Sequence, residues 1–243
     1  MDTIKFDKNN VKVVAHRGLS GLERENTCPS FVAAGNRSYF GIETDVHVTA
    51  DGKFVIIHDE TTKRVSLDTF DVNVENANSE EIEKVFLPDL DGSYNRRDIR
   101  IPFLSDYIKI CKKYEKVCVL ELKNHFVEED TVRLIDEIKS LEYLDSVIFI
   151  SFDLDNCRTL RKLLPDAQIQ WLLGNDDPSD EIIKILVDNK FGIDIYYKAL
   201  NEDNVKKLHS KGIEINCWTC DDKVDGEYLA NIGVDYMTSN ILE

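Results

Sequence analysis

Three acidic residues stand near the ends of apolar runs that are typical of β-strands. Glu43 and Asp45 lie two residues apart in Gly-Ile-Glu-Thr-Asp-Val, so in a strand both carboxylates face the same side. Glu121 stands in Val-Leu-Glu-Leu-Lys, two residues before Lys123 and on the same face. Carboxylates without cysteine ligands form a hard oxygen site that suits Mg²⁺, Mn²⁺ or Ca²⁺. The pattern therefore predicts one divalent cation held by Glu43, Asp45 and Glu121.

Two histidines end further apolar runs. His16 follows Val-Val-Ala and precedes Arg17, and His58 follows Phe-Val-Ile-Ile. One histidine can accept a proton from an attacking oxygen while the other donates a proton to a leaving oxygen. Arg17 and Lys123 supply the positive charge that a phosphoryl group requires in the transition state. Together with a cation, these side chains predict metal-assisted cleavage of a phosphoester.

Each of these features also has a structural explanation when it is taken singly. A lone histidine at a strand end is more often a hydrogen-bonded structural residue, and a Glu-x-Asp pair is more often an exposed edge. His47 shares the face of Asp45 and is expected to be structural. Cys217 and Cys220 have the spacing of a redox or half-zinc motif, but a strand places them on opposite faces. The joint occurrence of histidines and carboxylates at strand ends is what favours a shared site.

The elements that must position these residues alternate along the chain. Eight Val- and Ile-rich runs are expected to be strands, at residues 11–16, 41–48, 117–123, 147–151, 168–173, 192–197, 214–219 and 234–238. Seven helices are expected between them, at residues 28–39, 104–114, 128–142, 154–164, 179–189, 202–210 and 225–231. This pattern predicts an α/β fold, a (β/α)8 TIM barrel without its last helix, in which catalytic groups gather at the carboxyl ends of strands. A doubly wound open sheet is the alternative.

Two segments depart from the alternation. The apolar run at residues 53–58 follows a turn at 49–52 too closely for a full βα repeat, so it is expected to be an extension or a short return strand. Residues of about 60–102 are acidic, with few apolar residues in sequence, and form a small insertion after the second strand. Long irregular insertions are usually functional, so this one is expected at the barrel mouth. Residues 1–243 are expected to form a single domain.

The composition limits the possible partners. The 243 residues include 46 Asp and Glu against 30 Lys and Arg, which gives a formal net charge of −16 and argues against nucleic-acid binding. Six dispersed cysteines are expected to be reduced core thiols rather than a disulfide scaffold. The N-terminal residues resemble neither a signal peptide nor a membrane span. A cytoplasmic protein without stable membrane insertion is therefore expected, and its oligomeric state is left open.

In order along the chain, these residues resemble the motif series of the glycerophosphodiester phosphodiesterases. The matching segments are His16-Arg17-Gly18, Glu25-Asn26-Thr27, Glu43-x-Asp45, Thr49-x-Asp51-Gly52, His58-Asp59, Glu121-x-Lys123 and Trp218-Thr219, and the resemblance extends over about residues 11–240. It implies a TIM barrel with a small inserted region after the second strand. It also implies hydrolysis of a glycerophosphodiester, a small-molecule substrate, to sn-glycerol 3-phosphate and an alcohol.

The resemblance further implies a role for each matching residue. His16 and His58 would be the general acid and base, Glu43, Asp45 and Glu121 would bind the cation, Arg17 and Lys123 would bind the phosphate, and Trp218 would form an apolar wall for the glycerol moiety. The chain departs from the family pattern at Arg24, where a proline is frequent, and at Cys28, where a hydrophobic residue is frequent. Both positions lie beside the site, so they concern substrate fit rather than the chemistry.

Two other functions are weighed against this one. A phospholipase-type phosphodiesterase of related barrel fold would favour an exposed apolar or basic rim for membrane docking, which a net charge of −16 without a polybasic cluster opposes. A noncatalytic barrel that only binds a partner would be expected to lose a histidine or a carboxylate, whereas this chain has the complete set. The alcohol head group depends on loop shapes, which the sequence leaves open.

Overall fold

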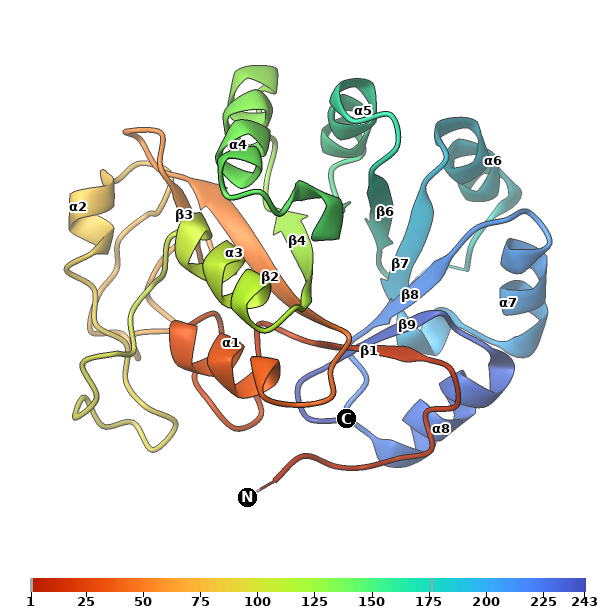
Figure 1. The fold of residues 1–243 in the computed structure, drawn as a ribbon, viewed down its shortest axis with the longest axis horizontal. Coiled ribbons are helices and arrows are strands. Elements are labelled where there is room, and N and C mark those ends of the chain that lie inside the picture. The colour runs from red at the N-terminus through yellow and green to blue at the C-terminus, as the bar shows by residue number, and fades with distance from the viewer. Residues whose placement is uncertain (1, 176) are drawn as a thin grey trace.

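Eight parallel strands close into a barrel at the centre of the molecule (Figure 1). The computed structural model describes residues 2–175 and 177–243. The barrel strands are β1 (Lys12–Ala15), β2 (Gly41–Val48), β4 (Val117–Leu122), β5 (Val147–Ser151), β6 (Gln168–Leu173), β7 (Gly192–Tyr196), β8 (Ile215–Trp218) and β9 (Tyr236–Ser239). Because β1 pairs with both β2 and β9, the barrel is closed, and the predicted TIM barrel is confirmed against the open sheet.

Seven helices connect the barrel strands and surround them (Figure 1). They are α1 (Cys28–Gly35), α3 (Leu104–Lys113), α4 (Glu128–Ser140), α5 (Leu154–Leu163), α6 (Asp180–Asn189), α7 (Glu202–His209) and α8 (Lys223–Ile232). Two single 3₁₀ turns, Leu144–Ser146 and Tyr197–Ala199, complete the connections. Leu134 of α4, Leu160 of α5 and Leu208 of α7 are fully buried in the main core, together with strand residues such as Phe149. An apolar stripe on each helix therefore faces the barrel, and polar residues face the solvent.

Two helix boundaries differ from the sequence prediction because of side-chain caps. The helix expected at 28–39 ends at Gly35, where the Asn36 side-chain amide donates to the Val32 carbonyl oxygen at 2.8 Å. The helix expected at 225–231 begins at Lys223, because the Asp222 carboxylate accepts hydrogen bonds from the backbone of the first turn. Periodicity locates the middle of a helix, whereas its ends depend on such local bonds.

The run at residues 53–58 is a return strand, as one of the two expectations had it. Strand β3 (Phe54–Ile56) pairs antiparallel with β2, with Val48 opposite Phe54 and Val46 opposite Ile56. The Ile57 amide then donates to the Asp45 carbonyl oxygen at 3.1 Å. Strand β2 therefore extends past the end of the barrel, and β3 leads the chain back. This return places His58 next to Asp45 at the barrel end.

The insertion is more ordered than its sequence indicated. Residues 60–102 contain the short helix α2 (Ser79–Ile82) and supply most of a second hydrophobic core that also includes Val55 and Ile57. Its members from the insertion are Val65, Val74, Ala77, Ile82, Val85, Leu87, Ile99 and Ile101. These apolar residues are spaced without a period, so only tertiary folding brings them together. The backbone of the segment is mostly irregular, as its sequence indicated, but its apolar side chains pack into this core beside β3.

Gly18 lies in the turn that leaves β1 and has a positive φ of 75°. A Cβ at this position would stand 2.3 Å from Ser30 Oγ. We expect Gly18→Ala to lower the free energy of unfolding by about 1–3 kcal/mol, because left-handed strain and a steric clash act together. Chemical denaturation measures this loss.

The control for that substitution is Gly212→Ala. Gly212 has a similar φ of 72°, but, apart from Gly212 and its two chain neighbours, no heavy atom of the described residues stands within 4 Å of the place a Cβ would occupy. The control therefore includes the strain and not the clash. An equal loss of stability in the two variants would contradict the importance of the contact with Ser30.

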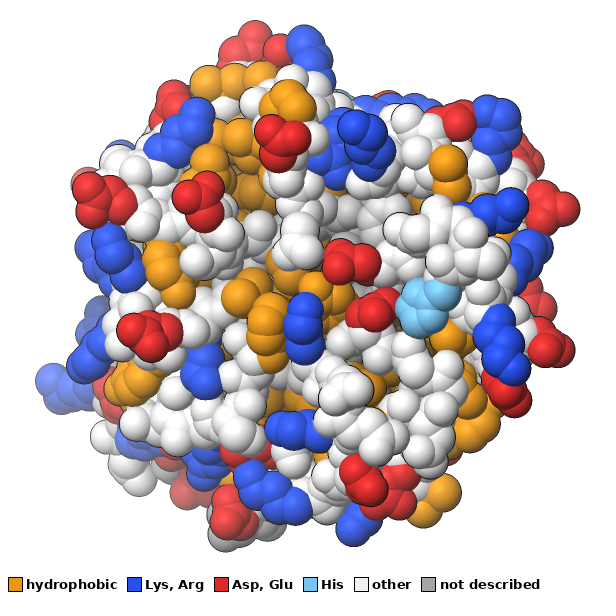
Figure 2. All heavy atoms as spheres, turned by 45° about the vertical axis from the view of Figure 1, so that its right-hand side comes forward, with side chains coloured by type: hydrophobic (Ala, Val, Ile, Leu, Met, Phe, Trp, Pro, Cys, Tyr) orange, Lys and Arg blue, Asp and Glu red, His pale blue; other side chains and the backbone are white. Residues whose placement is uncertain are grey.

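The surface and the cysteines agree with the composition. Acidic and basic side chains are interspersed over the face that Figure 2 shows. Within the described part of the chain, no helix has both the length and the apolar character that a bilayer span requires. All six cysteines are free thiols, and Cys217 and Cys220 are buried.

Candidate active site

Three carboxylates from two neighbouring strands meet at the carboxyl end of the barrel. Glu43 and Asp45 project from β2 and Glu121 from β4, and Asp45 is the ladder partner of Glu121. All three residues are buried, with no more than 7% of their surface exposed. One oxygen of each carboxylate lies within 4.8 Å of an oxygen of the others. The structure thus brings together the three residues that the sequence grouped.

The protein by itself does not balance the charges of this cluster. Burial, and next the neighbouring Asp45, raises the pKa of Glu43 well above its usual range and the pKa of Glu121 to about 8. Burial also opposes ionisation of Asp45, but Arg17 and Lys123 hold the pKa of that carboxyl below its usual range. Glu43 and Glu121 therefore tend to retain protons at neutral pH unless a further positive charge enters the site.

The cluster fits a divalent cation. Asp45 Oδ1 is buried and has no hydrogen-bond partner among the residues that the structure describes. A cation between the three carboxylates would ligate this oxygen and offset the repulsion between Glu43, Asp45 and Glu121. A set of three carboxylates is the donor chemistry that Mg²⁺, Mn²⁺ and Ca²⁺ prefer.

Two basic residues border the carboxylates. The Arg17 amide donates to Glu43 Oε2 at 2.8 Å, and its Nε lies 3.5 Å from Asp45 Oδ2. Arg17 has a positive φ of 53°, a strained conformation that turns the chain at the end of β1 and brings its amide to Glu43. Lys123 Nζ lies 2.8 Å from Glu121 Oε1 and 3.6 Å from Asp45 Oδ1. The positively charged side chains of Arg17 and Lys123 therefore lie at the edge of the carboxylate cluster.

His16 is held by an amide that is itself held by a carboxylate. Its Nδ1 lies 2.7 Å from Asn240 Oδ1, and Asn240 Nδ2 donates to Asp221 Oδ2 at 2.6 Å. Because the Asp221 carboxylate only accepts, the Asn240 oxygen faces the ring, so Nδ1 of His16 carries the proton. The lone pair is then on Nε2, which lies 3.9 Å from Glu43 Oε2. Burial, and next the charge of Arg17, lowers the pKa of His16 to about 4.

His58 is held by a carboxylate directly. Its Nδ1 donates to Asp59 Oδ1 at 2.7 Å, which leaves Nε2 free of that bond. Burial lowers the pKa of His58, while Asp45 and the hydrogen bond to Asp59 act in the opposite direction. The two histidines therefore differ in the group behind the ring, which is a neutral amide for His16 and an anion for His58.

A cavity of about 280 Å³ joins these groups. Its lining residues are His16, Arg17, Glu43, His58, Glu121, Ile150, Phe152, Leu172, Asp194, Trp218 and Thr238. Most of the charged residues come from the arc of β1 to β4, and the apolar ones follow or belong to β5, β6 and β8. Trp218 packs edge-on against Phe152, with ring centroids 5.7 Å apart. The cavity therefore suits a small molecule with an anionic group on one side and a carbon skeleton on the other.

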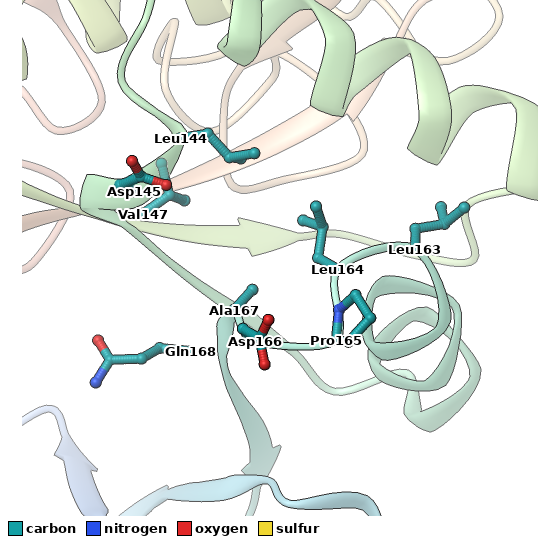
Figure 3. A pocket seen from close by; sticks show the side chains of 9 residues that line it. All are labelled: Leu144, Asp145, Val147, Leu163, Leu164, Pro165, Asp166, Ala167 and Gln168. Atoms are coloured by element: carbon teal, nitrogen blue, oxygen red, sulfur yellow. The ribbon is translucent and has the colours of Figure 1, made fainter.

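A second cavity, of about 350 Å³, lies at the amino ends of β5 and β6, the opposite strand ends from those that carry the carboxylate cluster, and Figure 3 shows its lining side chains. It is lined by the segments that lead into β5 and β6, which include Asp145, Pro165 and Gln168. No histidine, lysine or arginine is among the described residues that line it. It therefore lacks the groups that the chemistry of the first cavity uses.

Every residue expected at the site lies in or beside the first cavity, and the structure adds others. Asn26 Nδ2 donates to Asp45 Oδ2 at 2.7 Å and fixes that carboxylate. Asn240 and Asp221 stand behind His16. Asn26 belongs to the Glu25-Asn26-Thr27 motif of the family resemblance described above. No local sequence pattern indicated Asn240 or Asp221.

His47, for which a structural role was expected, contacts both the insertion and the site. It is fully buried, its Nδ1 lies 2.9 Å from Glu75 Oε1, and its Nε2 lies 3.3 Å from the His58 carbonyl oxygen. It thus connects the insertion to the backbone of His58.

Comparison with known proteins agrees with this geometry. The model of the glycerophosphoryl diester phosphodiesterase family matches residues 16–242. A glycerophosphodiester phosphodiesterase of Caldanaerobacter subterraneus is 29% identical over 227 residues, which cover 92% of this chain and 91% of the relative.

Solved structures give the same result for the fold. A phosphodiesterase of Oleispira antarctica, in complex with its product sn-glycerol 3-phosphate, superposes with a TM-score of 0.86 at 23% identity and covers 98% of this chain and 96% of its own. A glycerophosphodiester phosphodiesterase of Parabacteroides distasonis has a TM-score of 0.77 at 29% identity and covers 95% and 93%. Because the family model spans nearly the whole chain, this protein belongs to the glycerophosphoryl diester phosphodiesterase family and is a phosphoric diester hydrolase.

Proposed function

We propose that this enzyme hydrolyses glycerophosphodiesters to sn-glycerol 3-phosphate and an alcohol, with one divalent cation bound by Glu43, Asp45 and Glu121. The observation that carries the proposal is the cavity in which Glu43 and Glu121, two members of the carboxylate cluster, meet His16 and His58. Family membership supports the same substrate class. When bound, the cation would supply positive charge to the nonbridging phosphate oxygens and polarise the phosphorus.

His16 is proposed as the general base. Asn240 holds the proton on Nδ1, so Nε2 has the lone pair that accepts a proton from the attacking oxygen. A neutral ring is required for this step, and burial keeps His16 neutral at neutral pH because its pKa is lowered to about 4. The hydrogen bond to Asn240 raises the pKa of His16, but burial and the charge of Arg17 outweigh it, so His16 readily releases the proton again.

His58 is proposed as the general acid. Burial lowers the pKa of His58 on balance, so the ring must take up a proton before it can act as an acid. The Asp59 carboxylate accepts the Nδ1 hydrogen bond and stabilises the resulting imidazolium, which can donate its Nε2 proton to the leaving oxygen. The partner of Nδ1, which is the Asn240 amide for His16 and the Asp59 carboxylate for His58, is thus the basis for assigning the base role to His16 and the acid role to His58.

Arg17, Lys123 and Trp218 are proposed to bind the substrate. Arg17 and Lys123 border the carboxylates and can attract the phosphate, whose charge the cluster alone would repel. Trp218 lines the apolar part of the cavity and can cover the carbon skeleton of the glycerol moiety. We also propose that residues 60–102 work within the same catalytic domain, because Glu75 and the second core tie them to β2 and β3.

Release of sn-glycerol 3-phosphate from a panel of glycerophosphodiesters tests the proposal. We expect turnover of choline, ethanolamine, inositol or glycerol diesters when Mg²⁺, Mn²⁺ or Ca²⁺ is present, and none in excess chelator. Vesicles of intact phospholipid are the comparison substrate. Turnover of the vesicles without turnover of any water-soluble diester would contradict the proposal in favour of a phospholipase.

The same assay separates two routes of attack. The attacking oxygen can be that of water or the neighbouring hydroxyl group of the glycerol, and the second route forms a cyclic phosphate. Rapid quenching followed by a search for the cyclic phosphate distinguishes the routes.

A further inference from the structure

Arg64, in the insertion, binds two carboxylates at once through the two edges of its guanidinium group. On one edge, Nε and Nη2 donate to Asp59 Oδ2 and Oδ1 at 2.6 and 3.0 Å. On the other edge, Nη1 and Nη2 donate to Glu25 Oε2 and Oε1, both at 2.8 Å. Nitrogen Nη2 is shared between the two pairs. Only the planar fork of an arginine can make this double bidentate arrangement.

Each of these carboxylates also binds a residue of the proposed active site. Asp59 Oδ1 accepts from Nδ1 of His58 at 2.7 Å, and Glu25 Oε1 accepts from Nη1 of Arg17 at 2.8 Å. These are the same two oxygens that Nη2 of Arg64 contacts. Nη2 of Arg64 is therefore linked to His58 through the Asp59 carboxylate and to Arg17 through the Glu25 carboxylate.

The charges explain why the arrangement needs Arg64. Glu25 and Asp59 share one guanidinium, and without it they would repel each other. Although burial opposes ionisation, the hydrogen bonds from Arg64 help to lower the pKa of Glu25 and of Asp59, each to about 2. Both carboxylates are therefore ionised acceptors whose orientation is set by the guanidinium plane.

The exposure of Arg64 indicates that its contribution is to geometry more than to stability. Its side chain is 49% exposed, and exposed ion pairs contribute little to the free energy of folding. A displacement of about 1 Å at a reacting group, in contrast, can lower a rate about 100-fold.

We propose that Arg64 is a positioning residue for the reaction, which fixes the ring of His58 through Asp59 and the guanidinium of Arg17 through Glu25. Among the described residues, Arg64 does not line the cavity, and its hydrogen bonds and ion pairs go to Glu25 and Asp59 rather than to the carboxylate cluster, so it acts through these partners. The inference rests on the acid–base and phosphate-binding roles proposed above, and it gives the insertion a part in catalysis.

The insertion contains a matched control in Arg96. This side chain is 34% exposed and pairs with Glu23 at 2.8 Å, with Asp98 at 2.9 Å and with Asp89 at 3.5 Å. It therefore joins the insertion to the same loop between β1 and α1 that carries Glu25. In the described part of the chain, none of these three partners forms a hydrogen bond or ion pair with His58 or Arg17.

The experiment compares Arg64→Gln, Arg64→Lys and Arg96→Gln in steady-state kinetics and in thermal unfolding. We expect Arg64→Gln to lower kcat about 10- to 100-fold, with a smaller change in KM and little change in melting temperature. Arg64→Lys keeps the charge but loses the fork, so it should be nearly as impaired as Arg64→Gln. Arg96→Gln should keep wild-type kcat.

Chemical rescue completes the test. Millimolar guanidinium should restore part of the kcat of Arg64→Ala and should not activate Arg96→Ala or the wild type. Wild-type kcat in Arg64→Gln, equal losses in Arg64→Gln and Arg96→Gln, or full activity in Arg64→Lys would overturn the proposal. If Arg64→Gln does not fold, Arg64→Lys carries the same comparison. An inactive wild type would contradict the proposed function itself, so the two failures are distinguishable.

Discussion

Replacing His16 with alanine is expected to lower kcat by about 100- to 10,000-fold, while the melting temperature stays close to that of the wild type. The reason is that burial keeps the His16 ring neutral, with its pKa lowered to about 4, and that Asn240 holds the proton on Nδ1, which leaves Nε2 to accept a proton. His58→Ala should cause a loss of similar size. Steady-state turnover of a water-soluble glycerophosphodiester measures both variants.

The leaving group distinguishes the two histidines. A p-nitrophenyl diester of glycerol phosphate releases a phenolate that needs no proton, so His58→Ala should recover much of its activity on this substrate. His16→Ala should not, because the attacking oxygen must still lose its proton. Recovery of both variants, or of His16→Ala alone, would contradict the proposed division of roles.

His209 provides the control for His58. Its Nε2 lies 2.9 Å from Asp235 Oδ2, so it forms the same kind of imidazole–carboxylate pair, but it lies on α7 and does not line the cavity. His209→Ala should therefore keep wild-type kcat. His209→Ala is also the reference for His16→Ala. If His16→Ala keeps near-wild-type turnover, as His209→Ala should, His16 is not the general base.

Removal of divalent cations is expected to abolish turnover and to lower the melting temperature. Return of Mg²⁺, Mn²⁺ or Ca²⁺ should restore both, because a cation at 100 times its Kd stabilises the folded state by about 2.7 kcal/mol. Differential scanning calorimetry with chelator and with each cation measures this effect independently of activity. Full activity in excess chelator would contradict the metal site.

Substitution identifies the ligands. Asp45→Asn removes the one carboxylate of the cluster that the protein keeps ionised, so it should eliminate the cation-induced thermal shift. Asp194→Asn is the control, because Asp194 is also a buried carboxyl group of the cavity but lies on β7, outside the cluster. Burial raises the pKa of Asp194 well above its usual range, so an uncharged amide is a close substitute. The control should retain the shift.

The pH dependence of cation binding follows from the raised pKa values. Without a cation, Glu121 has a pKa raised to about 8 and holds a proton at lower pH. A cation must displace this proton, so binding releases protons and the affinity should decrease as the pH falls below about 8. Calorimetric titration in buffers of different ionisation enthalpy measures the released protons.

Much of the site was predictable because local periodicity carries the information. The period of two residues in a strand places Glu43 with Asp45, and Glu121 with Lys123, whatever the rest of the fold does. Parallel strands in a barrel end at the same edge, so strand-end residues of β1, β2, β4 and β8 had to lie near one another. These residues also follow one another along the chain in the order of the family motifs, which indicated that they belong to one site.

Other parts depended on contacts between distant segments. Asn240 reaches His16 across 224 residues of sequence because β9 pairs with β1 when the barrel closes. Arg64 reaches Glu25 across 39 residues only because the insertion packs against the loop after β1. No local pattern marks such partners.

The sequence by itself determined the barrel class, the residues that could do chemistry and the excess of acidic charge. Those properties follow from residue type and from the spacing of neighbours along one strand. The tertiary structure alone decided the tautomer of His16, the anionic support of His58 and the packed insertion that holds Arg64 between two carboxylates. Hydrogen bonds of this kind require atoms to meet within about 3 Å, and only the closed, packed fold brings them to that distance.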